Sequence, residues 1–142
     1  MGRVLGIDYG DVRVGLALSD ELKIISSPFK TVRNEGIDKV VELIKGEVLK
    51  NDVDTIVIGV PKSLQGDVTE QTRKVLLFID KLRNSVDVPV EEVDERFSSV
   101  EAVRVVHLKG KKAGHSKDEV NKIAASIILQ TYLDSISYER ER

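Results

Sequence analysis

The sequence predicts a mixed α/β sheet with helices on both faces, and three observations support this class. The first half of the chain holds short apolar runs of strand length, bounded by glycine, proline and acidic residues. Apolar residues then recur at helical spacing. Strand-like and helix-like segments alternate toward the end of the chain, which is typical of a sheet covered by helices on both faces.

Three strands are expected at the amino terminus. Residues 4–7 form a continuous apolar run, and residues 14–19 alternate large and small side chains as a second strand would. The segment between them is short enough for a hairpin turn. Residues 24–32 are expected to form a third strand, and Pro28 places it toward an edge of the sheet because proline cannot donate a hydrogen bond to a neighbouring strand.

The middle of the chain alternates between helix and strand. A helix is expected over residues 37–48, where apolar residues recur at helical spacing, and it ends before Asn51. The apolar run at 55–60 is typical of a strand covered on both faces. Asp67 and Glu70 fit a capping box at the start of a second helix. The buried stripe of that helix is expected to comprise Thr72, Val75, Leu76, Ile79 and Leu82.

A fifth strand and two helices complete the predicted fold. The strand covers residues 88–93 and runs directly into acidic residues. Ser98 and Glu101 fit a capping box for a third helix, which gives way to a basic loop. Ser116 and Glu119 fit another at the start of the last helix. Its buried face is expected to hold Val120, Ile123, Ala124, Ile127, Ile128 and Thr131.

Length and composition exclude several kinds of protein and site. The 142 residues are enough for one compact domain, expected to span residues 1–142. No stretch is apolar enough for a membrane helix, and the amino terminus lacks the layout of a signal peptide, so we expect a cytoplasmic protein with no membrane partner. With no cysteine and two histidines, zinc–thiolate and multi-histidine sites are excluded. Any metal would be a hard cation with oxygen ligands, Mg²⁺ or Mn²⁺.

Acidic residues follow two of the predicted strands. Asp8 comes after the first strand, and Asp94 and Glu95 come after the fifth. Ligands bind at the carboxyl ends of strands in an open α/β sheet, so these acids can converge. Clustered carboxylates repel one another unless a cation offsets their charge, and a divalent metal would do so. The alternative is that Asp8 only caps a turn and that the later acids pair with Arg96.

Glycines and one arginine surround the first of these acids. Gly6, Gly10 and Gly15 leave room for another backbone or for a phosphate, and Gly10 is expected to adopt the positive φ of a tight turn. Arg13 could bind phosphate or pair with Asp11.

Two further segments could bind phosphate. The loop 59–67, GVPKSLQGD, precedes a helix, and its backbone N–H groups could receive a phosphate beside Lys62; the alternative is an ordinary connection. The segment between Glu101 and Asp118 contains no acid. It forms either a nucleic-acid-binding loop or a solvated surface, and its cations are Arg104, Lys109, Lys111, Lys112 and Lys117.

Four motifs together resemble a known family. GIDYGDVRVG at 6–15, GVPKSLQG at 59–66, VDERFSSVEA at 93–102 and NKIAASIILQTYLD at 121–134 occur in this order. The chain thereby resembles the YqgF family, also called RuvX, of Holliday-junction-resolvase-like nucleases, over residues 3–134. The resemblance implies a ribonuclease H-like fold and a cytoplasmic bacterial protein that processes the 5′ end of pre-16S rRNA, or, in an older proposal, resolves branched DNA. Its partners would be structured RNA or branched DNA, and ribosomal precursor particles, and the protein would be a monomer or a weak homodimer.

The resemblance also implies a divalent-cation site made by three residues. Asp8 matches the acid of the first strand and Glu95 matches the second acid, with Asp94 as its neighbour and a substitute for it. Asn121 stands where the family pattern has an acid on the last helix. Its amide oxygen can bind a hard cation but brings no charge, so the metal should bind less tightly. Asp118 either compensates in part or is present for the helix dipole.

Three functions are compatible with these features. The leading hypothesis is a Mg²⁺- or Mn²⁺-dependent nuclease whose catalytic residues are Asp8, Glu95 and Asn121. The second is a nucleic-acid-binding module that Asn121 has weakened as an enzyme. The third is an actin-like or sugar-kinase ATPase, because GIDYGDVRVG also resembles the first phosphate-binding loop of those enzymes. Such enzymes need two domains, and this chain is long enough for only one of them. In a nuclease, the substrate phosphates would be held by Arg13, Lys62, Arg96, Lys109, Lys111, Lys112 and Lys117.

Overall fold

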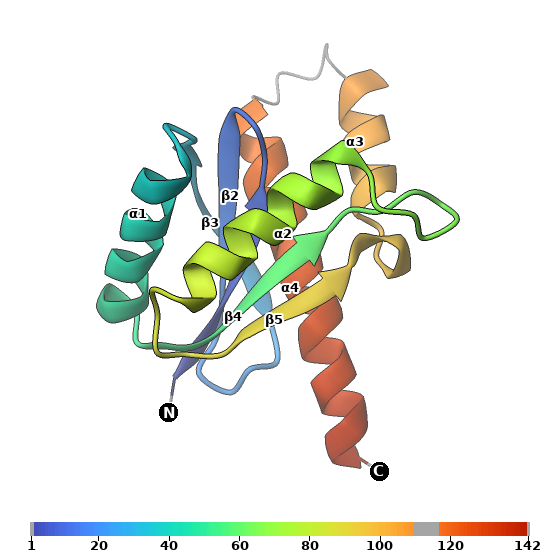
Figure 1. Cartoon of the computed structure of the whole chain (residues 1–142). Helices are drawn as coiled ribbons and strands as arrows, with labels where there is room; N and C mark the ends of the chain where they lie inside the picture. The colour runs from blue at the N-terminus through green and yellow to red at the C-terminus, as the bar shows by residue number, and fades with distance from the viewer. Residues whose placement is uncertain (1, 110–116, 142) are drawn as a thin grey trace.

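The protein is built on a five-stranded sheet with the strand order β3-β2-β1-β4-β5 (Figure 1), seen in a computed structural model that describes residues 2–109 and 117–141. β1 pairs antiparallel with β2 and parallel with β4, so the sheet is mixed, as predicted. The strands are β1 (Arg3–Tyr9), β2 (Arg13–Ser19), β3 (Ser26–Arg33), β4 (Val53–Val60) and β5 (Val90–Asp94). The helices are α1 (Ile37–Lys50), α2 (Glu70–Arg83), α3 (Val100–Lys109) and α4 (Lys117–Glu141), and a 3₁₀ turn, η1 (Glu95–Phe97), links β5 to α3.

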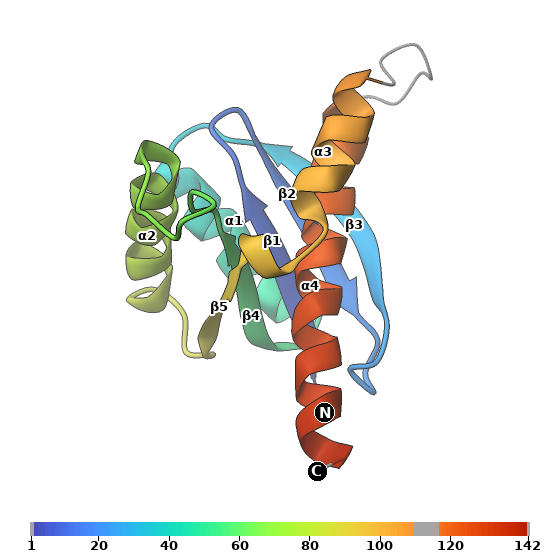
Figure 2. The same cartoon turned by 90° about the vertical axis from the view of Figure 1, so that its right-hand side faces the viewer.

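Helices cover both faces of the sheet, which confirms the predicted arrangement (Figure 2). We call these the α1/α2 face and the α4 face, and α3 lies beside the first turns of α4. β3 is an edge strand, so Pro28 removes no hydrogen bond from a central strand. No helix in the described part of the chain is long and apolar enough to cross a membrane.

Large aliphatic and aromatic side chains fill the α1/α2 face. Alternation along β1 and β4 directs every second side chain toward these two helices, where it is removed from water. The largest members of this core are Leu5, Ile7, Leu16, Ile44, Ile56, Ile58, Phe78, Ile79 and Leu82.

Small residues line the α4 face and let the helix lie close to the sheet. A Cβ atom on Gly6 would lie 2.7 Å from the Cβ of Leu129, and one on Gly15 would lie 2.0 Å from the backbone oxygen of Asn121. Both separations are too short for real atoms. The close backbone approach predicted for Gly6 and Gly15 is therefore confirmed, and the backbone in question is that of α4.

The β1–β2 turn corrects the expectation for Gly10. The positive φ values found at glycines in the described residues belong to Gly36 and Gly66, so the tight turn does not use one at Gly10. Instead, the N–H of Gly10 donates to the carbonyl of Arg13 at 3.0 Å, and a Cβ would lie 2.6 Å from that same oxygen. Glycine is needed here for space.

The limits of two helices also differ from expectation. α2 is capped by Thr69, whose hydroxyl accepts from the N–H of Thr72 at 3.2 Å, so the predicted capping box of Asp67 and Glu70 is wrong. Leu76 is exposed and Phe78 is buried in its place. On α4, the predicted start at Ser116 lies outside the described residues. The fully buried residues of α4 are Ala124, Ala125, Ile128, Leu129 and Leu133, so its buried stripe is rotated from the predicted one.

Candidate active site

Asp8 is a charged residue on the α4 face of a central strand. Alternation along β1 puts Ile7 among the large side chains of the other face and Asp8 on the same face as Gly6. Asp8 is 5% exposed and lies opposite Gly15 of β2. Because Gly15 has no side chain, nothing from β2 covers the carboxylate on that side.

Glu95 reaches the same region from the other half of the sheet. It is the first residue of η1, directly after β5, and it is 4% exposed. A Cβ on Gly59 of β4 would lie 2.7 Å from Glu95 Oε2, so Glu95 lies over a position that only glycine leaves open. The sheet thus brings together two carboxylates that are far apart in the sequence.

Asp94 is turned to a different set of partners. Its carboxylate accepts from the backbone N–H of Arg96 at 3.0 Å and pairs with the Arg96 guanidinium at 2.8 Å. Lys62 lies 3.9 Å away. Hydrogen bonds from Arg96 hold the pKa of Asp94 below its usual value. Of the two neighbouring acids, the structure therefore places Glu95, and not Asp94, beside Asp8.

Arg104 of α3 bridges the two buried carboxylates. Its Nη2 donates to Asp8 Oδ1 at 2.6 Å, and its Nη1 donates to Glu95 Oε1 at 2.8 Å. Burial raises the pKa of Asp8 to about 6; Arg104 opposes this effect and the nearby charge of Glu95 adds to it. Burial alone would lower the pKa of Arg104, but the two carboxylates raise it above its ordinary value.

Asn121 lies on the third side of this site. Its backbone oxygen sits over Gly15, the cross-strand partner of Asp8, and Asn121 lines the same cavity as Asp8, Glu95 and Arg104. The cavity has a volume of about 380 Å³. The three residues expected to form a cation site are thus brought together around one hollow.

Asp118 and Arg13 fix the start of α4 to the sheet. Arg13 Nε donates to Asp118 Oδ1 at 2.9 Å, and the Thr31 hydroxyl donates to the Asp118 backbone oxygen at 2.5 Å. Arg13 is therefore paired with Asp118, rather than with Asp11 as one alternative had it. These two contacts, the Arg13–Asp118 clamp, hold the first turn of α4 against β2 and β3, and Asn121 follows directly after that turn.

The chain is similar to known proteins over almost its whole length. A family model described as RuvX, Holliday junction resolvase, matches residues 2–135. The chain belongs to the RuvX family. It is 42% identical over 137 residues to a protein of Fusobacterium nucleatum named "Putative pre-16S rRNA nuclease", covering 94% of this chain and 98% of that one. A protein of Phocaeicola vulgatus with the same name is 40% identical over 141 residues, covering 97% and 99%.

Solved structures support the predicted ribonuclease H-like fold of this RuvX family member. Thermus thermophilus RuvC in complex with a Holliday junction substrate superposes with a TM-score of 0.56 at 12% identity, covering 96% of both chains. The fowlpox virus Holliday junction resolvase gives a TM-score of 0.56 at 14% identity, covering 94% of this chain and 99% of that one. At such identities the likeness concerns the fold, which is RuvC-like.

The donor atoms of the RuvX site fit a hard cation. Two buried carboxylates and an amide surround the cavity, and oxygen ligands of this kind suit Mg²⁺ or Mn²⁺. Within the described ranges, no three acidic or histidine side chains lie close enough together to hold a metal ion. A further side-chain ligand beside Asp8 and Glu95 would be an amide oxygen, and the amide side chains that line the cavity are those of Asn121 and Gln71.

The structure describes the side chains of only some of the basic residues predicted to bind phosphate. Lys62 and Arg96 lie at the carboxyl end of the sheet, and the Arg96 guanidinium packs against Gly66, whose φ is +90°. This contact ties the 59–67 loop to η1. The remaining predicted lysines are not placed: Lys111 and Lys112, and the side chains of Lys109 and Lys117, lie outside the described residues.

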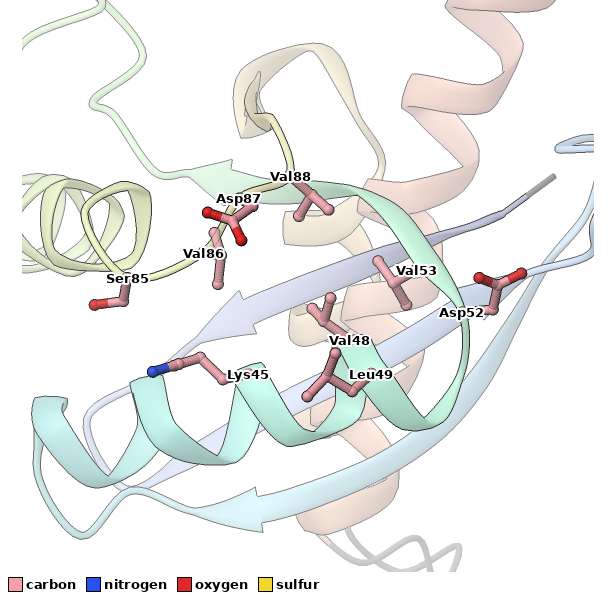
Figure 3. A pocket seen from close by; sticks show the side chains of 9 residues that line it. All are labelled: Lys45, Val48, Leu49, Asp52, Val53, Ser85, Val86, Asp87 and Val88. Carbon is pink, nitrogen blue, oxygen red and sulfur yellow. The ribbon is translucent and has the colours of Figure 1, made fainter.

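A second hollow lies at the opposite end of the sheet (Figure 3). It has a volume of about 360 Å³ and lies between the end of α1 and the segment that joins α2 to β5. Its walls are largely apolar, with Val48, Val53 and Val86 among them, and its two acids, Asp52 and Asp87, come from different segments. It lacks a buried carboxylate pair, so the chemistry is expected at the first cavity.

Sequence reasoning missed two contributors to the site. Arg104 was grouped with the basic loop, whereas it is the counter-ion of both buried acids. Its position three residues after Glu101, on a helix that follows Glu95 directly, is the signal that could have indicated this role. The sequence places Gly59 at the start of a possible phosphate-binding loop, whereas in the structure it makes room for Glu95.

Proposed function

We propose that this RuvX family member is a cytoplasmic, divalent-cation-dependent nuclease that hydrolyses phosphodiester bonds in precursors of 16S rRNA. The observation that carries the proposal is the pair of buried carboxylates, Asp8 and Glu95, which face one cavity together with Asn121. Buried carboxylates need a positive charge beside them, which the Arg104 guanidinium supplies here and which a metal ion could also supply. The names of relatives at about 40% identity support the substrate.

The proposed cation ligands are Asp8, Glu95 and the amide oxygen of Asn121. A bound Mg²⁺ or Mn²⁺ supplies an activated water and stabilises the charge that develops on the leaving oxygen. The chain's own residues shield and position the proposed ligands. Burial keeps the two carboxylates away from bulk water, and the Arg13–Asp118 clamp keeps Asn121 in place.

The proposed partner is the sugar-phosphate backbone of a structured RNA. Lys62 and Arg96 lie just after β4 and β5, each next in sequence to a residue that lines the cavity, and there they can attract phosphates without reading bases. We include Lys109, Lys111, Lys112 and Lys117 in this surface on the basis of their charge in the sequence. Such contacts would give affinity that falls with salt and depends little on sequence.

Branched DNA is a second candidate substrate. The family model that matches residues 2–135 is described as a Holliday junction resolvase, and the fold is RuvC-like. A four-way junction is two-fold symmetric, so a resolvase would have to act as a dimer. A third candidate, a nucleic-acid-binding module with little activity, rests on Asn121 at the position of an expected acid.

The test compares wild type with Asp8→Asn on a 5′-extended 16S rRNA precursor and on a four-way DNA junction. Loss of a charged cation ligand should reduce Mg²⁺-dependent cleavage by at least roughly 100-fold, because each 1.4 kcal/mol of lost transition-state stabilisation is a factor of ten. The matched control is Asp38→Asn, an exposed aspartate paired with Lys81 on the other side of the molecule. Cleavage that Asp8→Asn leaves unchanged would refute the proposal, and cleavage of the junction alone would favour the resolvase.

A further inference from the structure

The Arg104 guanidinium occupies the space between the two buried carboxylates. Its two terminal nitrogens are divided between them, with Nη2 on Asp8 and Nη1 on Glu95. Charge-assisted hydrogen bonds of 2.6 and 2.8 Å are short and strong. In the structure as it stands, Arg104 supplies the positive charge that two desolvated acids require.

Arg104 uses one oxygen of each acid, Asp8 Oδ1 and Glu95 Oε1. Glu95 Oε2 lies over Gly59 and is directed at the sheet, so Oε1 is the oxygen left to the cavity, and Oε1 is hydrogen-bonded to Arg104. A Mg²⁺ ion binds its oxygen ligands at about 2.0–2.1 Å in a crowded octahedral shell. A guanidinium and such an ion cannot lie between the same two carboxylates at once.

Arg104 also has a position to which it can withdraw. It belongs to α3 and not to the sheet, and its side chain is 28% exposed. Glu101, three residues earlier on the same helix, accepts from Nη1 at 3.0 Å and is 71% exposed. A guanidinium that leaves the buried pair therefore keeps a carboxylate partner at the surface.

We propose that Arg104 is the resident counter-ion of the Asp8–Glu95 pair and that a divalent cation binds there by displacing it. The inference rests on the proposed function for the existence of the cation site, and it adds what sets the affinity of that site. Arg104 offsets part of the negative charge of the acids in the metal-free protein, which keeps the fold stable, and it weakens metal binding because the two cations compete. Metal loading and the release of Arg104 are then a single event.

The first experiment measures Mn²⁺ binding by calorimetry and by the EPR signal of free Mn²⁺, with no substrate present. Arg104→Met should bind Mn²⁺ roughly tenfold more tightly than wild type, since the competing hydrogen bonds to both acids are gone. Arg104→Lys, which keeps one charge but lacks the planar fork that spans two carboxylates, should fall between the two. Arg73→Met, an exposed arginine of α2 paired with Glu70, is the matched control and should bind as wild type does.

The second readout is thermal stability. In chelator, Arg104→Met should melt at a lower temperature than wild type, because two buried acids then face each other without a counter-ion. Added Mn²⁺ should raise the melting temperature of Arg104→Met more than that of wild type, since ligand binding stabilises the folded state by mass action. If Arg104→Met does not fold in chelator, the same comparison is made with Arg104→Lys.

The proposed displacement of Arg104 would be wrong if both Arg104 variants bound Mn²⁺ no more tightly than wild type does. It would also be wrong if none of the proteins bound Mn²⁺. The cleavage assay separates this failure from that of the proposed function. An active wild type whose Mn²⁺ affinity does not depend on Arg104 would overturn the exchange and leave the nuclease assignment in place. Tighter Mn²⁺ binding by Arg104→Met in a protein without divalent-dependent cleavage would support the exchange and refute the nuclease.

Discussion

The two faces of the sheet are packed by opposite means. The α1/α2 face is filled by large side chains, with Phe78 and Leu82 among those fully buried. The α4 face also buries Ile128, Leu129 and Leu133, but it depends on glycines for space: α4 backbone atoms lie over Gly6 and Gly15, and side-chain atoms lie over Gly59. Large side chains stabilise the fold by removing apolar area from water, at about 25 cal/mol per Å². Small ones contribute less of this, but they decide how near a helix can lie.

This difference explains why the candidate site is on the α4 face. Asp8 and Tyr9 are neighbours in β1, yet alternation sends them to opposite faces. Tyr9 stacks on Phe78 with ring centroids 4.1 Å apart, whereas Asp8 lies beneath Arg104 and near the first turns of α4. The buried Asp8–Glu95 pair thus lies on the α4 face, whereas the larger of the two apolar clusters fills the α1/α2 face.

The largest effect on stability is expected from the α1/α2 face. Leu82→Ala removes a fully buried side chain near the end of α2, far from the acids, and should lower the free energy of unfolding by about 4 kcal/mol. Cleavage per folded molecule should stay at the wild-type level. Urea unfolding and the cleavage assay measure the two quantities. Loss of activity in the folded fraction would contradict the separation of the faces.

On the α4 face, Gly15→Ala should damage both stability and activity. The added Cβ would meet the backbone of Asn121 at 2.0 Å, and backbone cannot yield as a flexible side chain can. We expect a loss of about 3 kcal/mol in unfolding free energy and a much larger fall in cleavage than Leu82→Ala causes, because Asn121 is pushed away from Asp8.

The matched control for Gly15 is Gly46→Ala on the exposed side of α1, where a Cβ meets nothing within 4 Å. It should stabilise the protein by about 0.5–1 kcal/mol, because alanine favours the helix. Wild-type cleavage by Gly15→Ala would show that the close approach of α4 does not position the site.

The pH dependence of stability should distinguish the faces. The pKa of Asp8 is raised by burial from 3.8 to about 6, so the folded state holds this proton more tightly than the unfolded state does. The resulting contribution, on the order of 3 kcal/mol, is fully present below pH 3.8 and is lost as the pH rises through 6. Relative to Asp8→Asn, the wild type in chelator should therefore lose stability over this range.

Leu82→Ala should keep the wild-type pH dependence, since its face carries none of this effect. Urea unfolding of the three proteins at pH values from roughly 3.5 to roughly 7.5, which spans this window, makes the comparison. If the unfolding free energies of wild type and Asp8→Asn change with pH in the same way, the Asp8 carboxyl does not bind its proton more tightly in the folded state than in the unfolded state.

A smaller effect is expected from restoring the helix acid. Asn121→Asp adds a charged ligand beside Asp8 and Glu95, and should tighten Mn²⁺ binding by roughly tenfold, because affinity rises with ligand charge. Its metal-free form should be slightly less stable, owing to like-charge repulsion. Mn²⁺ titration and the Mg²⁺ dependence of cleavage provide the measurements. A nearly inactive wild type that Asn121→Asp makes active would favour the binding-module alternative over the nuclease.

The sequence predicted most of the strands and helices because apolar periodicity depends on local burial. The run at 55–60 became β4, an interior strand, and Pro28 did mark an edge strand. Capping was less predictable: Thr69 and Thr72 cap α2, a pair whose role depends on where the preceding loop ends. The buried stripe of α4 was rotated from the expected one because it follows the glycines of the sheet, which no helical pattern reveals.

By itself, the sequence determined the family, the mixed sheet and the two acids that meet at its carboxyl ends. These follow from residue types and spacings along the chain. Only the tertiary structure decided that Glu95, and not Asp94, faces Asp8, since a single turn of backbone after β5 sends the two carboxylates to different partners. It also decided that Arg104 is the shared counter-ion of the pair. Such a contact joins residues 96 positions apart, and Coulomb attraction acts on distance in space, not along the chain.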